Sequence, residues 1–195
     1  MVNTNDREKE QYPDVHVNRA RKEDFSMAPQ FRRIVTGHDA EGKSIVVIDG
    51  PPSAFGAFWQ TERAPADNHT TADVAQSVHT LEPRPLGSIF RYAVIPPEDP
   101  NVPAKEREAA IARMFAQMEA EHCRPDTSRH PGMHKTRTVD YVILLSGEVT
   151  LLLDHGEVDL KPFDVVVQRG TNHAWVNKGK EPALIAAVLI DAGEL

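Results

Sequence analysis

The sequence predicts an all-β protein folded as a small barrel or sandwich. Two observations lead to this prediction. From residue 31 onward, short runs of β-branched and aromatic residues alternate with turns rich in Gly, Pro, Asn and Asp. Between residues 140 and 195 these runs are regularly spaced, and several are apolar at consecutive positions, as in strands covered on both faces. One amphipathic segment interrupts the series.

The composition is that of a water-soluble globular protein. The 195 residues suffice for one domain with a hydrophobic core, 40% of them are hydrophobic, and the formal net charge is -7. The negative charge argues against nucleic acid or an anionic membrane surface as a partner. The single cysteine, Cys123, excludes an intrachain disulfide, which fits a cytoplasmic protein. No secretion signal or bilayer-spanning run is expected.

Two regions are expected along the chain. Residues 1–30 are polar and charged and form an extended N-terminal arm, either mobile or packed on a partner subunit. Residues 31–195 form one barrel domain. Its strands are expected over residues 31–38, 43–50, 55–61, 88–97, 141–146, 148–154, 156–170, 173–177 and 182–192.

Residues 104–122 are expected to form a helical insertion in this domain. Ile111, Met114, Phe115 and Met118 recur at helical spacing, while charged residues occupy the remaining positions. A lone helix in a β-protein must bury its apolar stripe. Two arrangements stay open, one on the outside of the barrel or against a partner subunit, the other as a lid over a pocket.

Three side chains form a candidate metal site. His134 and Asp140 are six residues apart, and an even separation places both on the same face of a strand. His173 opens a later strand after a Gly turn and is the candidate third ligand. Two imidazoles and one carboxylate suit Fe, Zn, Mn, Ni or Cu and leave coordination positions open for water or substrate.

These segments resemble the paired motifs of the cupin superfamily, whose fold is a double-stranded β-helix, or jelly-roll, barrel. The matching positions are His134, Asp140 in place of a Glu, and Gly147 in the first motif, and Gly170, His173 and Asn177 in the second. The resemblance implies one divalent metal and a homodimer. Thr136 stands where the family has a second His, and Pro162 and Gln168 replace a motif Gly and Pro. The alternative is a relic site, with both histidines as hydrogen-bonded barrel residues.

Other residues are weaker candidates for the site. Thr136 and Trp175 share the strand faces of the two histidines and line the expected pocket, although Trp175 equally suits the core. Gln168 precedes the Gly turn that leads to His173, where it would hydrogen-bond a metal-bound water. Arg137 falls on the opposite face from His134, which favours the surface over a role in binding a substrate carboxylate.

A zinc site close to the first motif is not favoured. His122, Cys123 and His130 cluster there, but their spacing matches no closed four-ligand zinc site, and Cys123 has no signature of a nucleophile.

The expected function is a metal-dependent enzyme acting on a small organic molecule such as an oxo-acid, an aromatic or a polyketide-like compound. Lewis-acid lyase, decarboxylase or isomerase chemistry and iron-dependent dioxygenase chemistry both suit the ligand set. Two alternatives stay open. One is a non-catalytic cupin that binds or senses a small molecule through a degenerate metal site. The other is a structural protein that dimerises through the arm and the 104–122 helix.

Overall fold

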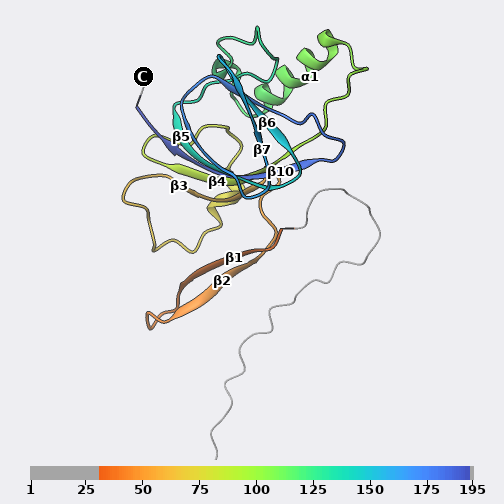
Figure 1. The fold of residues 1–195 in the computed structure, drawn as a ribbon. Coiled ribbons are helices and arrows are strands. Elements are labelled where there is room, and N and C mark those ends of the chain that lie inside the picture. Colours follow the sequence, from red (N-terminus) through yellow and green to blue (C-terminus); the bar gives the residue numbers. More distant parts are fainter. Residues whose placement is uncertain (1–30, 194–195) are drawn as a thin grey trace, which may run out of the picture.

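The computed structural model describes residues 31–193, which fold as a jelly-roll barrel with one α-helix (Figure 1). The expected arm, residues 1–30, lies outside the described residues. The strands follow the apolar runs of the sequence with one correction: the single run expected from residue 156 to residue 170 forms two strands, because a turn in which Phe163 adopts φ +76 divides it. Their bounds are β1 Arg33–His38, β2 Ser44–Gly50, β3 Ala57–Thr61, β4 Ser88–Ile95, β5 Thr138–Ser146, β6 Val149–Leu153, β7 Glu157–Leu160, β8 Val165–Arg169, β9 His173–Val176 and β10 Ala183–Asp191.

Two antiparallel sheets make up the body of the barrel. One has five strands in the order β3-β4-β10-β5-β8, and the other has three in the order β7-β6-β9. The main core lies between them, because strands of both sheets turn their apolar side chains inward. It contains Val142, Leu144, Val149, Leu151, Leu160, Ala183 and Ile185.

Strand β5 shows how the sequence sets the inner face of the larger sheet. Thr138, Asp140, Val142 and Leu144 are buried at alternate positions, and Tyr141 and Ile143 between them are exposed. This period of two is that of a pleated strand. It places Asp140 on the inner face, in the middle of otherwise small or apolar side chains.

Two motif residues serve the backbone rather than the chemistry. Gly147 follows β5 with φ +79, and a Cβ there would lie 2.6 Å from the Cα of Ala183, so only Gly suits this turn. Asn177 is fully buried, and its amide donates to the carbonyls of Ile95 and Glu181. Both residues therefore hold neighbouring strands at the barrel ends.

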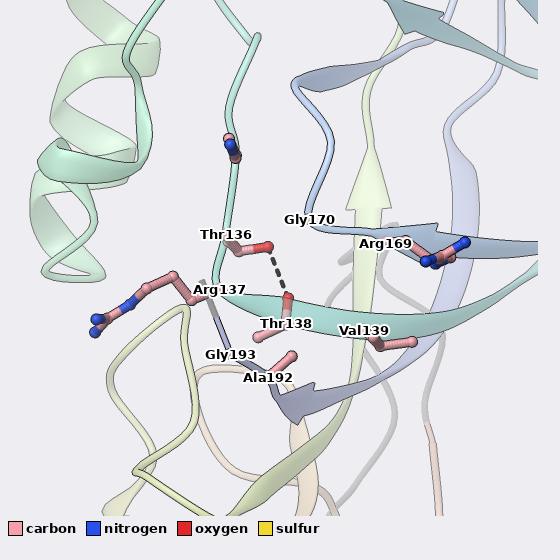
Figure 2. Close-up of a pocket in the computed structure, with 9 residues that line it drawn as sticks. Thr136, Arg137, Thr138, Val139, Arg169, Gly170, Ala192 and Gly193 are labelled. Atoms are coloured by element: carbon pink, nitrogen blue, oxygen red, sulfur yellow. Dashed lines mark hydrogen bonds between the residues drawn. The ribbon is translucent and has the colours of Figure 1, made fainter. Parts of the chain in front are cut away.

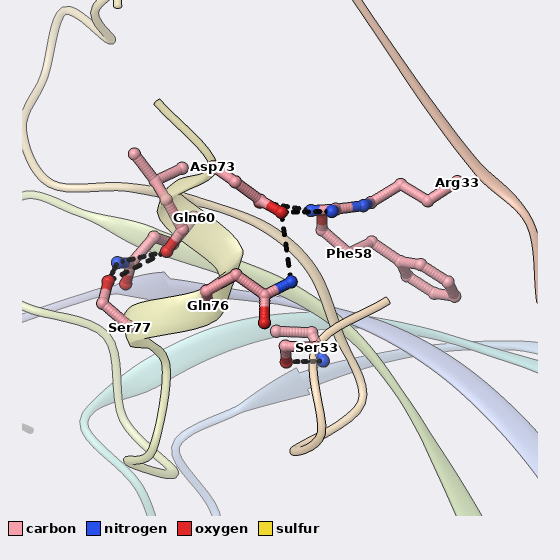
Figure 3. A network of polar contacts seen from close by, with 9 residues as sticks. Arg33, Ser53, Phe58, Gln60, Asp73, Gln76 and Ser77 are labelled. Carbon is pink, nitrogen blue, oxygen red and sulfur yellow. Dashed lines mark hydrogen bonds and ion pairs between the residues drawn. The ribbon is translucent and has the colours of Figure 1, made fainter. Parts of the chain in front are cut away.

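Strands β1 and β2 form a separate hairpin that projects from the barrel (Figure 1). Its first residue, Arg33, is tied back to the body. The Arg33 guanidinium donates to both carboxylate oxygens of Asp73 at 2.6 and 2.5 Å, and to the carbonyl of Phe58 at 3.1 Å. Asp73 in turn accepts a hydrogen bond from Gln76 (Figure 3). This bidentate pair fixes the base of the hairpin.

The helix α1 runs over Ala104–Gln117 and is shorter than the sequence predicts. Glu119 adopts φ +53, and the Ala120 amide donates to the Phe115 carbonyl, which closes the helix in a left-handed turn. A short 3₁₀ turn over Glu121–Cys123 follows. Within residues 31–193 the helices are too short or too polar to cross a membrane.

Candidate metal centre and ligand cavity

A cavity of about 410 Å³ opens between the inner face of the five-stranded sheet, β9 and α1. Its walls are mainly apolar, contributed by α1 through Met114, Phe115 and Met118 and by the sheet through side chains such as Val142 and Ile185. Of the two arrangements that the sequence left open for the helix, the structure has the one in which the helix covers a pocket. Size and lining are typical of a site for a small organic ligand.

His134 and His173 lie side by side in the wall of this cavity. Their backbones form an antiparallel bridge, with N–H···O distances of 2.8 and 2.9 Å, and their ring centroids are 4.2 Å apart. This bridge brings the two motifs together, although 39 positions separate them in the sequence.

The hydrogen bonds of both rings fix the same tautomer. The Nδ1 of His134 lies 2.9 Å from the Gly132 carbonyl, and the Nδ1 of His173 lies 2.9 Å from the Thr171 carbonyl. A carbonyl only accepts, so each Nδ1 carries the proton and each Nε2 keeps a free lone pair. Burial lowers the pKa of His134 and lowers that of His173 to about 3, so both rings are neutral at pH 7. They are therefore ready to bind a metal.

Asp140 contributes a carboxylate to the same cavity. Its side chain is 6% exposed, and its Oδ1 has no hydrogen-bond partner among the described residues. Burial raises the pKa of Asp140 to about 6, against a hydrogen bond from Thr138 that lowers it. A buried carboxylate oxygen without a partner is costly. A cation, or a ligand that donates a hydrogen bond to this oxygen, would remove that cost. The two imidazoles and the carboxylate are therefore chemically suitable metal ligands.

The ligand atoms of the three predicted residues do not all lie within 4.8 Å of one another. Among residues 31–193, one group of three side chains meets this criterion. It consists of Glu82, His122 and Cys123. None of these three lines the cavity. Burial, with the charge of Glu82, raises the pKa of Cys123 to about 12, so its thiol is a poor ligand at neutral pH. The cavity trio and this outer group are thus competing candidates.

The remaining predicted residues differ in where they lie. Thr136 and Trp175 line the cavity; the ring of Trp175 packs edge-on against His173 at 5.5 Å, and the Thr136 hydroxyl lies 2.7 Å from that of Thr138. Gln168 does not line it. Its amide donates to the carbonyl and hydroxyl of Thr171, so the side chain is used to hold the turn before His173.

A second depression lies near the start of β5. Thr136, Arg137, Thr138 and Arg169 are among the residues that line it (Figure 2). Figure 2 shows the side chains of Arg137 and Arg169 extending in opposite directions. Arg137 is exposed, as its place on the strand predicts. The two cations therefore do not converge on one ligand.

Two lining residues were not singled out as site residues from the sequence. Phe115 was visible as part of the apolar stripe of the helix, and its ring packs on His134 at 5.1 Å. Arg91 lies in the middle of β4 and lines the cavity. Its only signal was a charged residue inside an apolar strand, SIFRYAVI.

The fold and site define a class, a jelly-roll barrel with a histidine pair and a carboxylate on its inner wall. The chain belongs to the cupin family: the family description "Cupin domain" matches residues 121–190. The "Cupin-domain-containing oxidoreductase virC" of Hypocrea virens is 30% identical over an alignment of 179 residues, and the match covers 84% of this chain and 79% of the relative.

Further relatives come from fungal gene clusters and from solved structures. The "Phomopsin biosynthesis cluster protein C'" of Diaporthe leptostromiformis is 28% identical over 77% of this chain and 74% of its own length. Among solved structures, a Cupin 2 conserved barrel domain protein from Salinispora arenicola overlays with a TM-score of 0.34 at 16% identity. That overlay covers 54% of this chain and 64% of the bacterial protein.

Proposed function

We propose that this cupin is a metal-dependent enzyme that acts on a small organic molecule. The observation that carries the proposal is the inner wall of the cavity. Two neutral histidines with free Nε2 atoms line it, together with a carboxylate oxygen that has no partner among the described residues. The name of virC, a cupin-domain-containing oxidoreductase, and the biosynthesis-cluster relatives support an enzyme.

His134, Asp140 and His173 would hold one divalent ion from the group Fe, Zn, Mn, Ni and Cu. When bound, such an ion supplies Lewis-acid activation of a substrate oxygen or, if it is iron, oxidative chemistry. The protein's own part is positional. The carbonyls of Gly132 and Thr171 orient the two imidazoles, and the apolar walls exclude water from the bound molecule.

The alternative function is a non-catalytic cupin that binds or senses a small molecule. Two observations favour it. Thr136 replaces the second motif histidine, and the three remaining ligands do not converge within 4.8 Å in this structure. Loss of one ligand weakens metal affinity, whereas the cavity itself remains suited to a ligand.

Metal analysis of variants tests the proposal. Untagged protein loaded with each metal in turn is analysed by inductively coupled plasma mass spectrometry, together with His134→Ala, His173→Ala and, as a matched control, His122→Ala. We expect near-stoichiometric metal in the wild type and in His122→Ala, and loss of metal in both cavity variants. Metal lost only in His122→Ala would assign it to the outer group. A wild type that takes up no metal would favour the binding protein.

A further inference from the structure

Arg91 is a half-buried cation in the cavity wall, and it forms no ion pair with the other described residues. It lies on β4, is half-buried, and is the single Lys or Arg among the described residues that line the cavity. Its guanidinium donates to the carbonyl of Phe55 at 3.0 Å and, weakly, to that of Thr80 at 3.5 Å. Both partners are neutral, and none of the ion pairs found among residues 31–193 involves Arg91.

This arrangement is costly unless a ligand completes it. A charge removed from water needs a counter-charge, and carbonyl dipoles replace one only in part. Burial lowers the pKa of Arg91, yet a guanidinium remains protonated at any physiological pH. The two carbonyls hold the group in place while leaving its charge uncompensated. An anionic group of a ligand bound at this point of the cavity would therefore be stabilised by Arg91.

The sheet register places Arg91 on the same inner face as the candidate metal ligands. Arg91 pairs with Ala187 of β10, which pairs with Val142 of β5, and Asp140 is the next inward residue on β5. At a strand spacing of about 4.8 Å, the backbones of Arg91 and Asp140 are on the order of 10 Å apart across the sheet. Ala187, which lies between them, has a small side chain and leaves room for a molecule that spans this distance.

We infer that Arg91 binds a carboxylate of the substrate and so directs the rest of the molecule toward His134, Asp140 and His173. The planar edge of a guanidinium matches the two oxygens of a carboxylate. A phosphate is less suitable, because the surrounding wall is apolar and offers few further donors. Met114, Phe115 and Trp175 would contact an apolar or aromatic remainder. The substrate class is therefore an apolar or aromatic carboxylic acid, an inference that rests on the proposed function for what happens to it.

The test compares acids with their uncharged amides. A series of phenyl-substituted acids of increasing chain length, starting from phenylacetate and 3-phenylpropanoate, is titrated beside the matching amides by ligand-observed NMR. The titrations use wild type, Arg91→Gln, Arg91→Lys and the control Arg113→Gln, which removes an exposed arginine of α1. We expect wild type to bind at least one acid about tenfold to a hundredfold more tightly than its amide.

The variants separate the charge of Arg91 from its shape. Arg91→Gln should abolish the preference for the acid and leave amide binding unchanged, Arg91→Lys should retain part of it, and Arg113→Gln should retain all of it. A wild type without preference for any acid, or a preference that survives in Arg91→Gln, would overturn the inference. If circular dichroism shows that Arg91→Gln does not fold, the Arg91→Lys variant serves as the test. It should then show a reduced preference for the acid, and an unchanged preference would overturn the inference.

Running each titration with and without metal separates this inference from the proposed function. A preference that persists in chelator-treated protein supports the role of Arg91 even if no metal binds. Stoichiometric metal uptake without any preference for acids leaves the metal centre in place and rejects Arg91 as the carboxylate anchor.

Discussion

At the scale of single residues, the candidate site combines groups that suit each other poorly without a ligand. Asp140 is buried, with one oxygen that has no hydrogen-bond partner among the described residues, and the two neutral histidines line the same cavity. Such features cost folding free energy and are typical of sites whose chemistry needs them. The cost should be measurable as a dependence of stability on pH.

Replacement of Asp140 by Asn should stabilise the metal-free protein at neutral pH. The folded pKa of Asp140 is raised to about 6, above its ordinary 3.8, so its ionised form opposes folding. This penalty is fully present above pH 6, amounts to about 3 kcal/mol, and disappears as the pH falls toward 4, where the carboxyl is protonated in both states.

Chemical denaturation with a chelator at several pH values measures this effect. The gain of Asp140→Asn over wild type should shrink steadily between pH 7 and pH 4. An equal gain at both pH values would mean that the burial of the charge is not its cause. Metal-loaded wild type should in contrast be the more stable protein, because the variant loses a ligand.

At the scale of elements, α1 joins the stability of the barrel to the shape of the cavity. Phe115 is 2% exposed, packs with Ala120 and Cys123, and touches the ring of His134, whereas Met114 one position earlier is 46% exposed. One helix face therefore serves both as a core element and as the cover of the site.

Truncation of Phe115 should destabilise the protein and loosen the site together. Phe115→Ala should lower the free energy of unfolding by about 3 kcal/mol or more, the usual cost of removing a buried aromatic ring. Met114→Ala also shortens a cavity-lining side chain and should cost less than about 1 kcal/mol, since Met114 is half exposed. Urea denaturation of both variants makes the comparison. Equal losses would show that the helix does not bury Phe115 in solution.

At the scale of the whole molecule, the outer face of the larger sheet exposes several apolar side chains. Tyr141, Val165 and Val167 are between 50% and 63% exposed, and Tyr141 pairs with Val167 across β5 and β8, so the exposed groups are contiguous. On the separate hairpin, Ile34 and Val46 are also exposed. Exposed apolar patches of this kind are typical of interaction surfaces.

We propose that a second copy of the chain covers this face, giving the homodimer that the resemblance to cupins implies. Sedimentation analysis should then give twice the chain mass of 21.7 kDa. Replacing both Val165 and Val167 by Lys should yield monomers, because two buried charges oppose association. Val158→Lys places the same charge on an equally exposed valine of β7 and should leave the dimer intact. A monomeric wild type would contradict the proposal.

The sequence alone determined most of the strands, the helix, and the face of each element that is apolar. The period of two around Asp140 and the helical spacing of Met114, Phe115 and Met118 are local patterns, and the structure confirms both. The end of the helix at Gln117 was missed, because the left-handed turn at Glu119 has no Gly or Pro to mark it. The metal site itself stays a prediction.

Only the tertiary structure decided which side chains share the cavity and which are used elsewhere. Gln168 was expected at the pocket, but its amide is hydrogen-bonded to Thr171 instead. Arg91 lies in the site because strands β4, β10 and β5 pair in a register that places it on the face of Asp140. The bridge between His134 and His173 is likewise a contact between distant segments. Period and spacing fix the face on which a side chain lies. The neighbours of that face are set by strand pairing between segments far apart in the chain, which no local pattern encodes.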